Sequence, residues 1–200
     1  LNSHLCQNKI ILSLKFIIRI RRMSISKNFE NDIKVNQVSE GNFTANISED
    51  WSIGQTANGG YSMALLAKAC SKYLEHKDPL VLSANYIDRV DFGPAEIEVS
   101  KIATTKSTSS ASVSLRQKGI LKIFSTVTFT DFSKMSGLND NLRQAPDFES
   151  YENCIQIPYK EGFNPKLDKN LEKKYCSDSI WWEKSDDKND AVLKLSLIHI

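Results

Sequence analysis

The segment of residues 61–75 most constrains the fold, because it has the period of a helix and almost no polar surface. Its apolar residues recur at intervals of three and four, and alanine and leucine fill most of the remaining positions. Only Lys68, Ser71 and Lys72 mark an edge that faces water. A helix of this kind is buried nearly all round, so the rest of a small domain must wrap around it.

The segments on both sides of this helix alternate between apolar and polar residues, which is the period of a strand. In order along the chain, these segments are residues 41–47, 81–90, 95–100, 111–116 and 121–129. The last two flank Lys118 and Gly119 and read as a hairpin. One strand, one buried helix and four further strands predict an α+β domain at residues 41–132, in which an antiparallel sheet curls around the helix.

The charge of the chain depends on its first 22 residues. The whole sequence has 26 basic and 24 acidic residues, but five of the basic residues and none of the acidic ones precede Met23, the first methionine. Without them, 21 basic residues stand against 24 acidic ones, a formal charge of −3. The apparent basicity vanishes, so we expect no nucleic-acid partner.

Residues 1–22 are typical of translated upstream sequence. A targeting segment is the alternative, because residues 10–20 form an apolar run, but the basic residues follow this run instead of preceding it. The run is also shorter than the roughly 20 residues of a transmembrane helix and contains Lys15 and Arg19, so we expect no membrane partner. Residues 23–40 read as a polar lead-in.

The chain beyond residue 132 lacks both periods. Residues 133–194 are rich in polar residues and read as a linker. Residues 195–200 resemble the translation of a common transposase sequencing adapter, which predicts that the natural sequence continues differently. A short apolar strand is the alternative interpretation of this hexapeptide.

The cysteines and histidines form no recognisable catalytic or metal-binding motif. Cys6, Cys70, Cys154 and Cys176 lack a Cys-x-x-Cys spacing, so neither a zinc site nor a disulfide framework is predicted, and a reducing, cytoplasmic compartment fits best. Two of the three histidines lie in the terminal segments, and His76 lies in a turn. We therefore expect no serine-histidine-aspartate catalysis.

Several motifs together resemble the acyl-CoA thioesterase II family and its thioesterase-like relatives. They are Asn58-Gly-Gly-Tyr61, Leu82-Ser-Ala-Asn-Tyr-Ile87, Gly93-Pro94, residues 107–119 and residues 124–129. The resemblance covers about residues 51–132 and implies the hotdog fold. It also implies two hotdogs in one chain, joined by residues 133–194, with the second hotdog supplying the aspartate, serine or threonine, and glutamine that activate water. The catalytic residues then lie outside this sequence.

The candidate binding residues are Asn58, Gly59, Gly60 and Gln117. A helix N-terminus offers unpaired N–H groups to the oxygen of a thioester, and glycine permits close approach, although capping alone also explains Asn58. Gln117 matches a family glutamine that faces the groove between hotdogs, or it caps its strand. Asp88 and Asp131 are interpreted as sheet-edge carboxylates without a basic partner. Lys106 stands where the family has an arginine, which puts a coenzyme A contact there in doubt.

The resemblance predicts an acyl-CoA thioesterase that releases a free fatty acid and coenzyme A without a metal or cofactor, this chain holding the N-terminal half. The alternative is a hotdog that binds acyl-CoA, or a partner, without catalysis. A hydratase ranks last, because it needs a suitably placed histidine. A lone hotdog exposes one face of its curved sheet, and paired hotdogs bury it as a continuous sheet, so we expect a homo-oligomer or pairing of two hotdogs within one chain.

Overall fold

The structure is a computed structural model that describes residues 29–137, 147–177 and 195–199. Residues 1–22, interpreted above as upstream sequence, lie outside this part of the chain. The chain divides into two compact units, one built from residues 32–144 and 165–167 and the other from the remaining residues. Among the described residues, no helix is long and apolar enough to cross a membrane.

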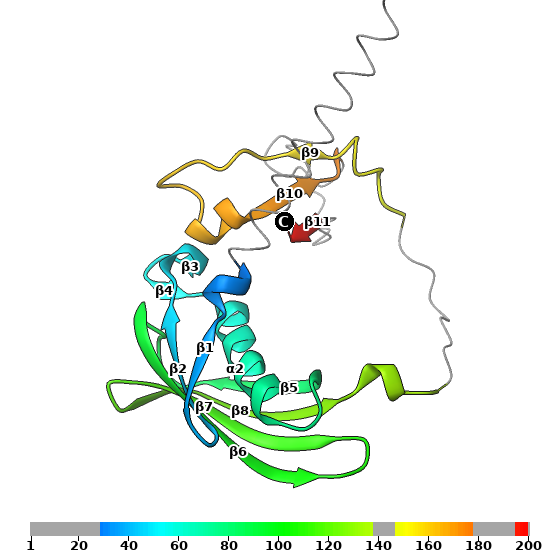
Figure 1. Ribbon diagram of the computed structural model, residues 1–200. Helices are drawn as coiled ribbons and strands as arrows, with labels where there is room; N and C mark the ends of the chain where they lie inside the picture. The colour runs from blue at the N-terminus through cyan, green and yellow to red at the C-terminus, as the bar shows by residue number, and fades with distance from the viewer. Residues whose placement is uncertain (1–28, 138–146, 178–194, 200) are drawn as a thin grey trace, which may run out of the picture. The chain divides into compact units, whose positions relative to one another are not determined.

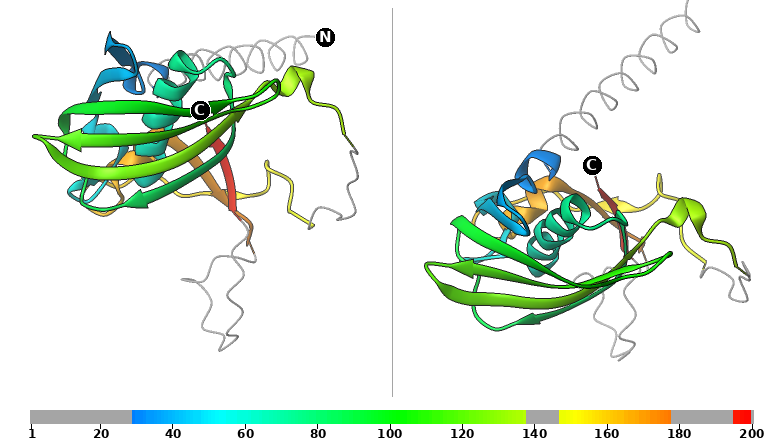
Figure 2. Two further views of the ribbon diagram at one scale, coloured as in Figure 1. Left: turned by 90° about the horizontal axis from the view of Figure 1, so that it is seen from below. Right: turned by 60° about the horizontal axis from the view of Figure 1, so that its bottom comes forward.

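The first unit is a six-stranded antiparallel sheet curved around the helix α2 (Gly59–Tyr73), as Figures 1 and 2 show. The order of its strands is β1-β2-β6-β7-β8-β5. Their bounds are β1 Val35–Ser39, β2 Asn42–Ile47, β5 Asp78–Tyr86, β6 Gly93–Thr104, β7 Ser109–Gln117 and β8 Ile120–Thr130. The short pair β3 (Ser52–Ile53) and β4 (Thr56–Ala57) precedes the helix. The predicted α+β hotdog fold is confirmed.

Strand register explains how the core forms. Phe43 pairs with Ile97, and Leu115 lies opposite both Ile97 and Ile123, so one apolar row crosses four strands. All four side chains are at most 1% exposed. Because alternate residues of a strand point to opposite faces, this register puts one apolar face toward α2.

Helix α2 is less completely covered than its sequence predicts. It begins at Gly59, two residues before the predicted start, because Asn58 caps it. The face toward the sheet is fully buried, and it includes Leu65, Leu66, Ala69 and Cys70. Residues 63, 64 and 67 are only half-buried, whereas Lys68 is exposed as expected.

Two segments differ from the sequence analysis. Residues 23–40, interpreted as a lead-in, contain strand β1, which pairs with β2. The sequence does not indicate this strand, because Val35 is its one buried residue and no alternation of apolar and polar residues results. The predicted strand at residues 81–90 ends as β5 at Tyr86, and residues 87–92 form a loop.

The second unit contains a small antiparallel sheet with the order β11-β10-β9. Its strands are β9 Ile155–Gln156, β10 Leu171–Tyr175 and β11 Leu195–His199. A 3-10 helix, η3 (Lys166–Asn170), leads into β10. Two of these strands lie in the segment interpreted as a linker, and β11 lies in the hexapeptide interpreted as adapter-derived.

Candidate functional site

The first unit has a cavity of about 630 Å³ where helix α2 begins. Three chain segments supply its wall: the strand before the helix, the first turn of the helix, and the end of β5 with its following loop. The lining residues are Thr56, Ala57, Gly59, Ser62, Tyr86, Ile87, Asp88, Arg89 and Val90. The wall thus combines apolar side chains with a helix N-terminus and two charged groups, a combination found in small-molecule sites.

Asn58 caps the N-terminus of helix α2, and two glycines form the start of its first turn. The Asn58 side chain accepts a hydrogen bond from the Tyr61 N–H at 3.2 Å, which leaves Gly59 and Gly60 at the start of the first turn. Their N–H groups have no acceptor within the helix, because helix geometry provides none. These groups create a positive electrostatic potential beside the cavity.

Tyr86 explains why Gly59 is a glycine. The Tyr86 hydroxyl donates to the Gly59 carbonyl at 2.8 Å, and a Cβ atom on Gly59 would lie only 2.9 Å from that hydroxyl. Tyr86 therefore packs directly over the first turn of α2. A larger residue at position 59 would require the Tyr86 side chain to shift.

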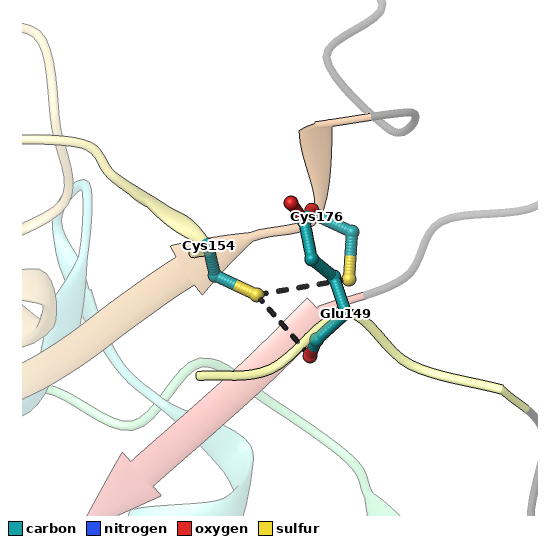
Figure 3. A group of neighbouring side chains, drawn as sticks. All are labelled: Glu149, Cys154 and Cys176. Atoms are coloured by element: carbon teal, nitrogen blue, oxygen red, sulfur yellow. Dashed lines mark hydrogen bonds between the residues drawn. The ribbon is translucent and has the colours of Figure 1, made fainter. Parts of the chain in front are cut away.

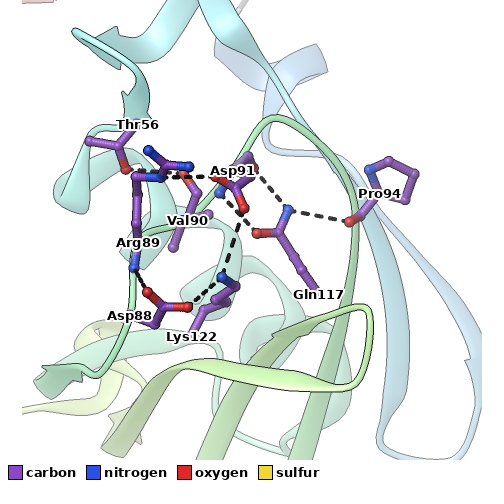
Figure 4. A network of polar contacts seen from close by, with 8 residues as sticks. All are labelled: Thr56, Asp88, Arg89, Val90, Asp91, Pro94, Gln117 and Lys122. Atoms are coloured by element: carbon purple, nitrogen blue, oxygen red, sulfur yellow. Dashed lines mark hydrogen bonds and ion pairs between the residues drawn. The ribbon is translucent and has the colours of Figure 1, made fainter.

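A charged network fixes the loop that forms one wall of the cavity (Figure 4). The Lys122 side chain is only 8% exposed, and its Nζ lies 2.6 Å from Asp88 Oδ2 and 3.8 Å from Asp91 Oδ2. Arg89 Nε lies 3.0 Å from Asp91 Oδ1. The hydrogen bond from Lys122 is the main reason why the pKa of Asp88 is lowered, and the Arg89 N–H adds to it. Asp88 is therefore an ionised, weakly basic carboxylate.

The interpretation of Asp88 as a carboxylate without a basic partner is wrong. Lys122 was missed because it lies between Leu121 and Ile123 in an alternating strand. The register of β7 and β8 shifts between Leu115 and Arg116, and this irregularity makes Lys122 and Ile123 both buried. The one sequence signal was a lysine within an apolar run. Asp131 also has a basic partner, Lys134, whose hydrogen bond lowers the pKa of Asp131 to about 2.

Gln117 forms hydrogen bonds with the backbone of the same loop. Its Oε1 accepts from the Asp91 N–H at 2.9 Å, and its Nε2 donates to the carbonyls of Asp91 at 2.8 Å and Pro94 at 3.3 Å. The side chain is nearly buried and is not part of the cavity wall. Of the four predicted binding residues, Asn58, Gly59 and Gly60 lie together at the helix N-terminus, and Gln117 supports the loop beside it.

The neighbourhood of His76 is a polar cluster at the other end of α2. His76 Nδ1 lies 2.8 Å from the Ser109 hydroxyl, and His76 Nε2 lies 3.4 Å from the Lys106 carbonyl. Ser109 also donates to Glu75 at 3.4 Å. Ser109 is completely buried, so a substrate cannot reach its hydroxyl. The cluster ties the helix end to β7 and is not a nucleophilic centre.

Most of the first unit is similar to a known family of domains. Residues 47–130 match the family model described as the acyl-CoA thioesterase N-terminal domain. This match covers the cavity wall, α2 and four strands of the large sheet. Residues 47–130 are therefore similar to a thioesterase domain, and the first unit has the hotdog fold.

Individual proteins of known sequence or structure are also similar to this chain. The thioesterase-like protein TwmA of Talaromyces wortmannii is 23% identical over 185 residues, which are 84% of this chain and 50% of that protein. A candidate thioesterase II from Thermobifida fusca YX superposes with a TM-score of 0.67 at 19% identity, covering 76% of this chain and 57% of the other. A hotdog protein of unknown function from Alicyclobacillus acidocaldarius superposes with a TM-score of 0.67 at 16% identity. The superposition covers 74% of this chain and 55% of that protein. The chain thus spans about half the length of these relatives.

Proposed function

We propose that the protein is an acyl-CoA thioesterase, which hydrolyses a fatty acyl-CoA to a free fatty acid and coenzyme A, and that this chain holds its N-terminal half. The match of residues 47–130 to the acyl-CoA thioesterase N-terminal domain carries this proposal. The cavity at the start of α2 supports it, because a helix N-terminus suits a thioester carbonyl.

The proposed role of the helix N-terminus follows from the chemistry of thioester hydrolysis. When water attacks the carbonyl carbon, negative charge develops on the carbonyl oxygen. Backbone N–H groups aimed at that oxygen stabilise the charge, and Gly59 and Gly60 are the residues of this chain that could supply them. Arg89, whose side chain is 61% exposed beside the cavity, offers a positive charge to a phosphate of coenzyme A.

We assign no general base to the described residues. Asp88 lines the cavity, but its ion pair with Lys122 lowers its pKa and makes it a poor base at neutral pH. The proposal therefore places the water-activating group in a second hotdog. We place the reaction in the cytoplasm, which the free thiols of Cys70, Cys154 and Cys176 support.

We also propose that β5 is the edge that pairs with another hotdog, in the same chain or in a second copy. Within the described sheet, β5 pairs only with β8. Leu80 and Val81 on this edge are 42% and 54% exposed. An unpaired strand with exposed apolar residues favours pairing with another strand.

The test is release of free coenzyme A from acyl-CoA substrates of several chain lengths by the protein translated from its complete natural transcript. The proposal predicts steady hydrolysis that falls in Arg89→Ala, mainly through a higher KM, because phosphate binding weakens. Arg116→Ala, which removes an arginine outside this cavity, is the matched control. Absence of hydrolysis at every chain length would refute the proposal.

The alternative function is a hotdog that binds acyl-CoA without hydrolysing it. The observation that favours it is the Lys122–Asp88 ion pair, which occupies the one carboxylate that lines the cavity. A non-hydrolysable thioether analogue of acyl-CoA separates the two functions. Tight binding of this analogue without any hydrolysis of acyl-CoA would establish the alternative.

A further inference from the structure

Two cysteines of the second unit face each other across a pair of strands, as Figure 3 shows. In this pair Ile155 lies opposite Tyr175 and Gln156 opposite Lys174. One further step of the same antiparallel register puts Cys154 opposite Cys176. Their sulfur atoms are 3.8 Å apart, and the two residues are only 8% and 2% exposed.

Glu149 adds a third donor from the turn before β9. Its carboxylate and the two sulfurs all lie within 4.8 Å of one another. The Ser177 N–H donates to Glu149 Oε2 at 2.8 Å, which orients the carboxylate. The turn is closed by hydrogen bonds from the N–H groups of Asn153 and Cys154 to the Ser150 carbonyl. The three donors therefore come from short, hydrogen-bonded pieces of chain.

The sulfur spacing suits a tetrahedral metal ion. Two Zn–S bonds of about 2.3 Å at the tetrahedral angle separate the sulfurs by about 3.8 Å. A disulfide requires about 2.05 Å, so the two sulfurs would have to move much closer. Thiolate ligands select soft or borderline ions such as Zn²⁺, and a carboxylate is an accepted additional ligand.

Lys174 completes the charge balance of such a site. Two thiolates and one carboxylate carry three negative charges, and Zn²⁺ compensates two of them. The Lys174 ammonium donates to the Tyr151 carbonyl at 2.9 Å and lies 4.0 Å from the centroid of the Tyr151 ring. Lys174 lies two residues before Cys176 and is paired with Gln156, which lies two residues after Cys154. Its positive charge compensates the third negative charge.

We propose that Cys154, Cys176 and Glu149 bind a zinc ion, with a water molecule in the fourth position. The ion would fasten the turn at residues 149–154 to the ends of β9 and β10, and each cysteine would lose its proton on binding. This site is separate from the proposed thioesterase function. The sequence did not predict it, because the 21 residues between the two cysteines match no short zinc motif.

Cobalt substitution tests the site, because tetrahedral Co²⁺ bound to thiolates absorbs strongly in the visible and near-ultraviolet range. The fully reduced 200-residue chain is titrated with Co²⁺ and then with Zn²⁺. We expect one equivalent of Co²⁺ to give the thiolate spectrum and one equivalent of Zn²⁺ to abolish it. Cys154→Ser and Cys176→Ser should each lose this spectrum. Absence of stoichiometric binding by the reduced chain would overturn the proposal.

Matched variants separate the site from general loss of structure. Cys6→Ser and Cys70→Ala remove the other two thiols of the sequence and should leave the titration unchanged. Glu149→Gln keeps both thiols and should weaken Co²⁺ binding by at least about tenfold. Circular dichroism checks that each variant remains folded. An unchanged spectrum in folded Cys154→Ser, or equal binding by Glu149→Gln, would overturn the assignment of these ligands.

Discussion

Lys122 is the residue whose removal best reveals how the cavity wall is held. It is nearly buried, whereas its partners Asp88 and Asp91 are 49% and 47% exposed. Lys122→Met leaves two carboxylates that water can solvate, so we expect a loss of only about 1 kcal/mol in the free energy of unfolding. The double change Asp88→Asn with Asp91→Asn leaves a buried ammonium unpaired and should cost clearly more than Lys122→Met. Urea unfolding at pH 7 measures both, and equal losses would contradict this account.

Glu75 gives a prediction about pH. Its hydrogen bond with Lys101 is the main cause that lowers its pKa from 4.5 to about 2. A lowered pKa in the folded state means that the charged form stabilises the fold above pH 4.5 and that this stabilisation is lost as the pH falls through about 2. Glu75→Gln should therefore lower the urea midpoint at pH 7, and this difference should shrink as the pH falls toward 2. The exposed residue Glu152, changed to Gln, is the control, and a difference of the same size at pH 7 and pH 2 would refute the prediction.

At the scale of elements, the hairpin of β7 and β8 depends on a two-residue turn. Lys118 and Gly119 have φ angles of 51° and 77°, so both occupy the left-handed region. Asparagine tolerates this region better than lysine, and alanine tolerates it less well than glycine. Lys118→Asn should stabilise the protein by about 0.5 kcal/mol and Gly119→Ala should destabilise it by about 1 kcal/mol. Thermal unfolding measures the two shifts, and shifts of the same sign would contradict the turn.

The same elements show what the sequence could predict. The apolar residues of helix α2 and of the hairpin recur at regular intervals, because one face of each element packs in the core. The bounds of both were therefore predicted to within about two residues. Strand β1 was missed because its single buried residue, Val35, gives no alternation. The helix N-terminus of the cavity was predicted from Asn58 and its glycines. The burial of Lys122 was not predicted, because an irregularity in the register of a hairpin has no clear sequence signature.

At the scale of the whole molecule, the open edge of the sheet predicts association. If β5 pairs with another hotdog, the isolated 200-residue chain should form dimers or larger species, because Leu80 and Val81 remain exposed. Val81→Lys should shift the chain toward the monomer, since a charged residue discourages edge pairing. Ile102→Lys, at a 66% exposed position on β6, is the control. A monomeric unaltered chain at high concentration, measured by light scattering, would count against hotdog pairing.

The proposed function requires that the cavity at the N-terminus of α2 binds the thioester. The most direct measurement is the change in backbone amide NMR signals of the ¹⁵N-labelled chain when a non-hydrolysable acyl-CoA thioether is added. We predict that the largest changes fall on Gly59 and Ile87, which line the cavity, and on Gly60 beside them. Changes confined to the outer face of the sheet, at residues such as Ser112 and Ser114, or no changes at saturating analogue, would contradict the account.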